Sequence, residues 1–211
     1  MTNAPVTGVL LAGGQSRRMG GGDKGLLPLA GKPMLQHVID RLRPQVAAIV
    51  LNANGDPARF QGFGLPVVAD TIAGQVGPLA GVLAGMRWSL AQAPHRPWVV
   101  TAAGDAPLLP RDLVDRLLVA VEDGAGRIAL ARSNGELHPV IGLWPVALAA
   151  DLEAALGEGV RKVLDWSNRH GSVGVDFPSE RLGGIEIDPF FNANTPQELD
   201  KLRRQLAPSR P

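Results

Sequence analysis

The feature that most constrains the fold is a regular alternation of short apolar runs with segments of helical periodicity. The runs are rich in β-branched residues, are followed by Gly, Asn or Asp, and span residues 9–11, 47–51, 67–69, 98–102 and 127–131. Between most of them, apolar residues recur every three or four positions, and Pro33, Pro78 and Pro110 stand where a helix can begin. Continuous apolar strands alternating with helices are typical of a mostly parallel sheet covered on both faces. We therefore expect an α/β fold, a three-layer α/β/α sandwich around a mostly parallel, Rossmann-like central sheet.

The final third of the chain is less regular than the rest. We expect a strand at residues 138–144 and helices at residues 147–156 and 161–170. Thr195 and Glu198 form a T-x-x-E capping box, which predicts that the last helix begins there.

The composition excludes several classes of protein. Hydrophobic residues make up 45% of the 211 and charged residues 19%, which suits a folded chain with a sizeable core. A formal net charge of +1 provides no overall attraction for nucleic acid or membrane lipid. The absence of cysteine excludes disulfides and thiolate metal sites. No apolar run reaches the about 18 residues of a membrane span, and the first residues lack the pattern of a signal peptide, so we expect a cytoplasmic location.

A glycine-rich, basic segment directly follows the first apolar run. Gly13 and Gly14 let backbone N–H groups approach an anion, and Arg17, Arg18 and Lys24 add positive charge. Phosphoryl transfer requires such oriented amides and cations, because charge develops on the phosphate oxygens. A solvent-exposed basic loop without a ligand is the alternative.

Two other phosphate-binding motifs do not fit this chain. Residues 20–25 match G-x-G-x-x-G, but they do not begin where the first run ends, and the second run ends in Asn52 instead of an acid. Gly31-Lys32 is followed by Pro33, where a Walker A loop requires Ser or Thr.

Polar residues follow three of the apolar runs. Asp105 comes just after the run at 98–102, Asp70 after the run at 67–69, and Asn52 after the second run. Ligands of parallel α/β sheets bind beyond the carboxyl ends of the strands. A carboxylate there suits Mg²⁺, which binds one or two carboxylates together with phosphate oxygens and water. An ordinary turn or cap residue is the alternative at each position.

The string from Leu11 to Lys24, Leu-Ala-Gly-Gly-x-x-x-Arg-Met-Gly followed by Asp-Lys, resembles the signature of the molybdenum cofactor guanylyltransferases. These are nucleotidyltransferases of the nucleotide-diphospho-sugar transferase fold type. The resemblance continues in order through residues 52–54, 77–81, 104–107, 138–140 and 192–196. It implies an enzyme that joins GMP from GTP to the phosphate of molybdopterin, with Mg²⁺ as cofactor and Mn²⁺ as an alternative ion.

The resemblance also implies roles for individual residues. The expected contacts to GTP are Leu11, Ala12, Gly13, Gly14, Lys24, Asn52, Asp70 and Asp105. Arg17, Lys24 and Asp105 are the expected catalytic residues, and Asp105 is the expected metal ligand. His138, Asn192 and Asn194 are expected on the acceptor side. Arg161 and Lys162 either meet the anionic acceptor or form a solvated face.

The expected organisation is one nucleotidyltransferase domain, residues 1–211. Its nucleotide-binding half covers about 1–110 and its acceptor-binding half about 111–206. GTP and molybdopterin are the expected substrates, and molybdenum insertion proteins and target molybdoenzymes are the expected protein partners. The alternatives are a cytidylyltransferase of the same cofactor, a sugar-phosphate nucleotidyltransferase, or a cofactor-binding chaperone without catalysis.

Overall fold

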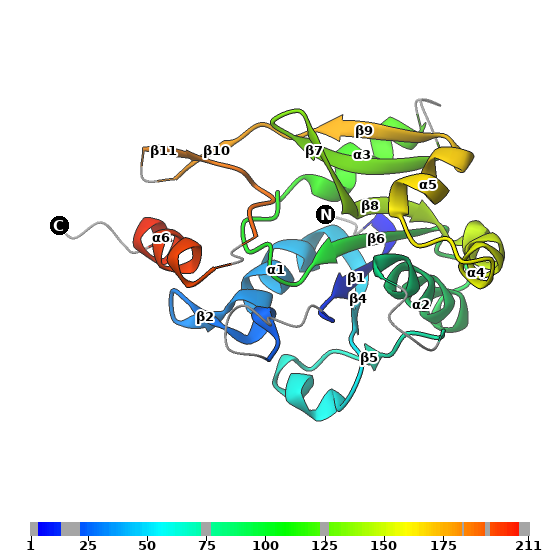
Figure 1. Cartoon of the computed structure of the whole chain (residues 1–211), viewed down its shortest axis with the longest axis horizontal. Helices are drawn as coiled ribbons and strands as arrows, with labels where there is room; N and C mark the ends of the chain where they lie inside the picture. Colours follow the sequence, from blue (N-terminus) through cyan, green and yellow to red (C-terminus); the bar gives the residue numbers. More distant parts are fainter. Residues whose placement is uncertain are drawn as a thin grey trace.

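A seven-stranded sheet, in the order β5-β4-β1-β6-β8-β7-β9, forms the centre of the computed structural model (Figure 1). The structure describes residues 4–13, 22–72, 77–122, 127–182, 184–192 and 195–206. The strands are β1 (Ala4–Leu11), β4 (Val46–Asn52), β5 (Val67–Val68), β6 (Trp98–Ala103), β7 (Ile128–Ser133), β8 (Glu136–Pro145) and β9 (Ser172–Asp176). β8 runs antiparallel to β6 and β7, and the other neighbouring pairs are parallel. The predicted mostly parallel sheet is therefore confirmed.

Helices cover both faces of the sheet. They are α1 (Met34–Leu42), α2 (Pro78–Gln92), α3 (Leu113–Glu122), α4 (Ala149–Gly157), α5 (Val163–Ser167) and α6 (Pro196–Leu206). α1 and α3 pack into one core, which contains Leu35 and Leu117. α2, α4 and α5 pack into a second core, which contains Met86, Leu152 and Trp166. The three-layer arrangement expected from the sequence is thus confirmed.

The two cores explain why the strands read as continuous apolar runs. In β1, Val6 and Leu10 belong to the first core, whereas Val9 belongs to the second, and all three are fully buried. Successive side chains of a strand point to opposite faces. Because both faces of this strand are covered, an apolar residue is favoured at nearly every position.

Short elements connect the main ones. The 3-10 helices are η2 (Lys24–Leu26), η3 (Arg43–Gln45), η4 (Pro57–Phe63), η5 (Val146–Leu148) and η6 (Asn168–His170). Two small antiparallel hairpins pair β2 (Pro28–Leu29) with β3 (Lys32–Pro33) and β10 (Glu180–Leu182) with β11 (Ile185–Ile187).

The last helix begins at the predicted capping box. The Thr195 backbone N–H donates to Glu198 Oε2 at 2.9 Å, and the Glu198 N–H donates to Thr195 Oγ1 at 3.2 Å. Leu199 and Leu202 then pack with Leu29 of β2 in a third, smaller core. α6, near the C-terminal end of the chain, therefore lies beside β2, which is near the N-terminal end (Figure 1).

The structure also differs from the sequence-based expectations in the second half. The helix expected at 161–170 is shorter, because Lys162 has an extended backbone and α5 ends at Ser167 before a 3-10 turn. The first turn of the helix expected at 147–156 is 3-10, and α4 proper begins at Ala149. β9 and the two hairpins were not expected from the sequence. Within the described residues, no helix has both the length and the apolar character of a membrane span.

Candidate active site

Three parallel strands end level with one another at one edge of the sheet. Leu11 is paired with Asn52 on one side and with Ala103 on the other. The backbone connections continue beyond the strands, since Ala12 N–H donates to Asn52 O at 2.9 Å and Gly104 N–H donates to Leu11 O at 3.0 Å. Ala12, Gly13 and Asp105 therefore follow directly from adjoining strand ends. Ligands in sheets of this kind bind at this edge.

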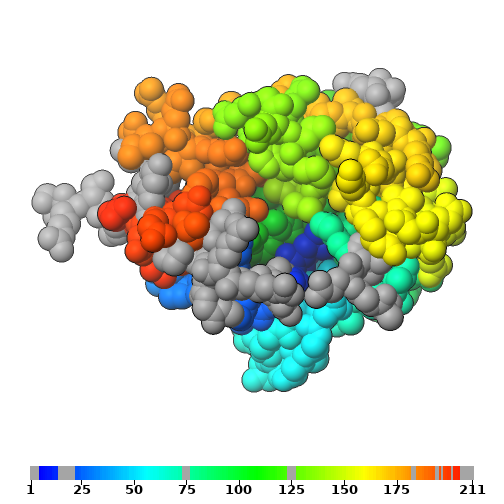
Figure 2. All heavy atoms as spheres, in the orientation of Figure 1, coloured from blue at the N-terminus to red at the C-terminus, as the bar shows by residue number. Residues whose placement is uncertain are grey.

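The same edge is hollowed on the molecular surface. Figure 2 shows blue and green atoms of the central strands at the bottom of a depression. The cyan segment that leads to β5 borders it on one side, and yellow and orange segments of the second half border it on the other. The depression is therefore lined by both halves of the chain.

An ion pair joins the glycine-rich segment to the end of β6. Lys24 Nζ lies 3.6 Å from Asp105 Oδ2, and the two side chains are 18% and 20% exposed. A Cβ atom on Gly25 would stand 3.0 Å from Gly104 O, so the glycine lets η2 approach this strand end closely. The 3.6 Å separation is longer than that of a hydrogen bond. The arrangement matters more for what it can bind, because it places a cation and a hard oxygen ligand side by side.

A second cluster holds Asp70 beyond β4 and β5. Asn52 Nδ2 donates to Asp70 Oδ1 at 2.9 Å, and Asn54 Nδ2 donates to Asp70 Oδ2 at 2.7 Å. The Asp70 backbone N–H in turn donates to Asn54 Oδ1 at 2.9 Å. Asn52 is only 6% exposed, and its amide also donates to Val68 O at 3.3 Å. Asn52 thus supports Asp70, which is the more accessible of the two.

Arg59 of η4 connects the glycine-rich segment to this cluster. Its Nε lies 2.6 Å from Asp23 Oδ2, the residue before Lys24. Its terminal nitrogens donate to Asn54 O at 2.6 Å and to Asp56 O at 2.8 Å. Sequence reasoning missed Arg59, because no pattern in the chain links it to Asp23 or Asn54.

His138 lies on β8 within a hydrogen-bonded chain. Its Nε2 is 2.6 Å from Ser133 Oγ, and Ser133 Oγ donates to both carboxylate oxygens of Asp188, at 2.8 and 2.9 Å. The His138 ring also packs 4.7 Å from the Phe190 ring, centroid to centroid. Burial lowers the pKa of His138, although the charges of Asp188 and Glu136 act in the opposite direction. Sequence reasoning found His138 but neither Ser133 nor Asp188.

Residues 8–173 match the family described as the MobA-like NTP transferase domain. The chain belongs to this family. A molybdenum cofactor guanylyltransferase from Mesorhizobium japonicum is 50% identical over 202 residues, which cover 95% of this chain and 96% of the relative. The guanylyltransferase resemblance that the sequence motifs carried is therefore confirmed.

Solved structures agree with the family. Molybdopterin-guanine dinucleotide biosynthesis protein A from Archaeoglobus fulgidus superposes with a TM-score of 0.69 at 26% identity, covering 94% of this chain and 97% of that protein. Rv0371c from Mycobacterium tuberculosis H37Rv, solved in complex with manganese, gives a TM-score of 0.63 at 19% identity, covering 95% and 99%. The second likeness shows the shared fold alone.

The expected site residues of this MobA-like chain fall into three groups. The structure brings Leu11, Ala12, Gly13, Lys24 and Asp105 together at the ends of β1 and β6, with Asn52 and Asp70 beside them. His138 and the half-buried Asn192 lie in the second half of the chain. Gly14, Arg17 and Asn194 lie outside the described residues. The individual roles of all these residues stay predictions.

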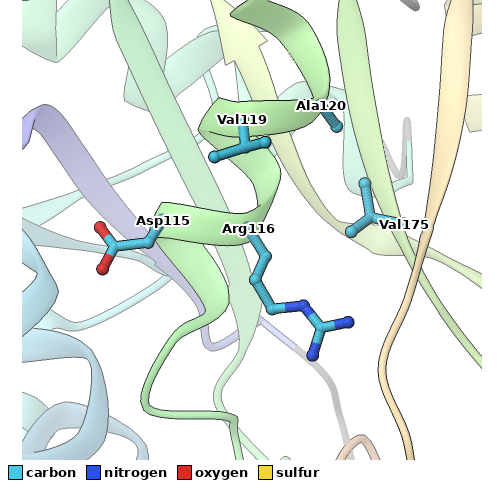
Figure 3. A pocket seen from close by; sticks show the side chains of 5 residues that line it. All are labelled: Asp115, Arg116, Val119, Ala120 and Val175. Atoms are coloured by element: carbon cyan, nitrogen blue, oxygen red, sulfur yellow. The ribbon is translucent and has the colours of Figure 1, made fainter. Parts of the chain in front are cut away.

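A separate apolar cavity of about 410 Å³ lies between α3 and β9 (Figure 3). Its lining residues are Asp115, Arg116, Val119, Ala120 and Val175. None of these residues follows the end of a parallel strand. The Arg116 guanidinium pairs with Asp112 and lies over the Phe177 ring. The cavity therefore lies apart from the candidate active site.

Proposed function

We propose that the protein transfers GMP from GTP to the phosphate of molybdopterin, giving molybdopterin guanine dinucleotide and pyrophosphate. The observation that carries the proposal is the Lys24 ammonium, 3.6 Å from the Asp105 carboxylate at the ends of adjoining strands. A guanylyltransferase that is 50% identical over nearly its whole length supports the choice of substrates.

The donor set at this edge fits a hard divalent cation. Asp105 provides a partly exposed carboxylate, and the chain has no cysteine. In the described part of the chain, no group of three or more His, Asp or Glu residues could hold a metal by itself. Phosphate oxygens and water would complete the coordination, as Mg²⁺ prefers. The manganese complex of the mycobacterial neighbour supports a divalent ion on this fold, with Mg²⁺ as our assignment and Mn²⁺ as the alternative.

In the proposed reaction, an oxygen of the acceptor phosphate attacks the α-phosphorus of GTP. A new P–O bond forms, the bond from the α-phosphorus to the bridging oxygen breaks, and pyrophosphate leaves with that electron pair. The acceptor phosphate is already ionised near neutral pH, so catalysis consists mainly of positioning and charge stabilisation. A divalent ion on Asp105 would neutralise charge on the phosphate oxygens.

The protein's own groups hold the nucleotide in this scheme. Lys24 places its ammonium at the phosphates, and the loop amides around Gly13 and Gly14 bind the triphosphate. Asp70, which its two asparagine partners hold in place, contacts the nucleoside. Arg17 is assigned to the departing pyrophosphate, and Asn192 and Asn194 to the acceptor.

The deciding experiment incubates the protein with GTP, Mg²⁺ and molybdopterin, followed by mass analysis of the dinucleotide. We expect the mass of the guanine dinucleotide and one pyrophosphate released per product. CTP in place of GTP is the control for base choice. Product from CTP alone, or GTP binding without pyrophosphate release, contradicts the proposal. Exchange with molybdenum insertion proteins and target molybdoenzymes, and a cytoplasmic location, stay predictions.

A further inference from the structure

Three residues from separate segments form a hydrogen-bonded chain beside the active-site edge. Ser133 ends β7, His138 lies on β8, and Asp188 follows β11. Ser133 is 2% exposed, and its Oγ lies 2.6 Å from His138 Nε2 and 2.8 Å from the nearer oxygen of Asp188. A buried hydroxyl between an imidazole and a carboxylate restricts where each hydrogen can be.

The hydrogens of this chain can be assigned by counting donors. An ionised carboxylate only accepts hydrogen bonds, so the single hydroxyl hydrogen of Ser133 goes to Asp188. Ser133 Oγ must then accept from His138, which places a hydrogen on Nε2. In the neutral ring, Nδ1 therefore carries a lone pair. Within the described residues, Nδ1 has no hydrogen-bond partner.

Burial favours the neutral form of the ring. Asp188, on the segment before α6, and Glu136, on β8, are the charged groups that favour its protonated form. Burial outweighs both, so the pKa of His138 lies below its usual 6.5. In this neutral form Nδ1 is an acceptor of hydrogen bonds.

The hydrogen bonds among Ser133, His138 and Asp188 also connect the acceptor-side segments. β8 pairs with β6 at Thr101, and from Gly142 to His138 it continues toward the end of β6 that carries Asp105. Asp188 Oδ1 accepts from the Phe190 backbone N–H at 2.8 Å, two residues before Asn192. Asp188 thus helps to hold both His138, through Ser133, and the segment that leads to Asn192.

We propose that Ser133 and Asp188 are positioning residues that hold His138 in its Nε2–H form, so that Nδ1 accepts a hydrogen bond from a ring N–H of the pterin acceptor. The identity of that acceptor rests on the proposed function. A lone pair on Nδ1 suits an N–H donor of a heterocycle and disfavours a phosphate, which only accepts hydrogen bonds. His138 therefore recognises the pterin and not its phosphate.

The sharpest test uses Asp188→Asn to reverse the donor and acceptor roles in the hydrogen bonds between residue 188, Ser133 and His138. The asparagine amide donates to Ser133 Oγ, so the hydroxyl hydrogen turns to His138 Nε2 and the ring hydrogen moves to Nδ1. We expect the ¹⁵N chemical shifts of the two ring nitrogens, measured by NMR on histidine-labelled protein, to exchange their protonated and unprotonated values. His138→Gln assigns the signals among the four histidines. Asp176→Asn is the matched control, because that exposed carboxylate pairs with Arg132 and does not touch the chain.

Kinetics separate a positioning role from a general structural one. For Asp188→Asn we expect the KM for molybdopterin to rise on the order of tenfold, as for a hydrogen-bond acceptor turned into a donor, while the Kd for GTP stays unchanged. Ser133→Ala should give a similar rise, and Ser133→Thr, which keeps the hydroxyl, should restore the wild-type KM.

Unchanged ring nitrogens in Asp188→Asn overturn the proposal, as does an equal loss of GTP and acceptor binding. If the wild-type protein shows no guanylyl transfer, the proposed function fails separately. The NMR comparison and direct binding of molybdopterin still decide the hydrogen-bonded chain in that case.

Discussion

Asp105 and Lys24 lie close enough to neutralise each other before any substrate is present. Their charged atoms are 3.6 Å apart, and each side chain keeps about a fifth of its surface exposed. A metal ion on the carboxylate would release the Lys24 ammonium from this pair. We expect the released cation to meet the phosphate oxygens, where charge develops during transfer.

Asp105→Ala tests this arrangement at the scale of one side chain. We expect a folded protein, because Asp105 belongs to neither large hydrophobic core and its pair with Lys24 is partly exposed. We expect Mg²⁺-dependent pyrophosphate release to fall by on the order of a hundredfold or more, since the expected metal ligand is lost. Asp112→Ala, an exposed carboxylate on the segment before α3, is the control and should retain wild-type turnover. Near-normal activity in Asp105→Ala would refute the metal role.

Among single residues, the sequence pointed to those that follow an apolar run. The placement of Lys24, Asp70 and Asp105 at one edge could be predicted, because strand ends in parallel sheets gather there. Arg59, Ser133 and Asp188 could not. Their partners lie 36 or 55 positions away, as with Asp23 and Arg59 or Ser133 and Asp188, and such distant contacts leave no local pattern.

At the scale of elements, η4 holds in place the segment that leads into Lys24, an arrangement called here the Arg59 clamp. The Asp56 side chain caps η4 by accepting from Ala58 N–H at 2.9 Å, and Arg59 reaches from η4 to Asp23. The guanidinium also holds the Asn54 carbonyl, so the glycine-rich segment and the Asp70 cluster share one support.

Arg59→Ala should loosen that clamp without unfolding the protein. We expect the KM for GTP to rise on the order of tenfold, because Asp23 and Asn54 each lose a charge-assisted contact. The denaturation midpoint should change little, since the side chain is near the surface. Arg87→Ala, which removes an arginine paired with Glu153 on α4, is the matched control. A KM for GTP equal to that of the control would show that η4 does not position the nucleotide.

The fit of α2 against β1 is a second property of elements. A Cβ atom on Gly81 would overlap Asn52 Oδ1 and Leu11 Cδ2, and one on Gly85 would overlap the Val9 side chain. The two glycines therefore let the helix lie close to the sheet. The Asn52 side chain occupies the space left by Gly81, and from there it supports Asp70.

At the scale of the whole molecule, the sheet joins the two halves of the chain. β5, β4, β1 and β6 come from the first half, and β8, β7 and β9 come from the second. The division into a nucleotide-binding half at 1–110 and an acceptor-binding half at 111–206 stays a prediction. The depression at the strand ends, which both halves border, is the observation that favours it (Figure 2).

The stability of the whole molecule should depend on pH in the acid range. The pKa of Asp151 lies below its usual value, first because Trp166 Nε1–H donates to the carboxylate and also because His170 does, against an opposing effect of burial. A carboxyl whose pKa is lower in the folded state stabilises the fold above its unfolded pKa, and this contribution is lost as the pH falls through the folded value. We therefore expect the urea midpoint to drop below about pH 4.

Asp151→Asn should make that drop smaller, because the side chain no longer titrates. Urea unfolding at pH 7 and pH 3, for wild type and variant, measures the difference. Asp165→Asn, an exposed residue of α5, is the control and should follow the wild type. A variant whose midpoint falls as steeply as that of the wild type would contradict the role of Asp151.

The sequence by itself determined the strands of the central sheet except β9, most of the helices that cover them, the capping box of α6 and the edge where the candidate site lies. These features depend on the hydrophobic period and on proline and cap residues within a few positions, so the local sequence determines them. The tertiary structure decided the antiparallel direction of β8, the edge strand β9, the Arg59 clamp and the chain through Ser133. Each of these depends on contacts between segments far apart in the sequence, whose free energy is gained only when the chain is folded around both cores.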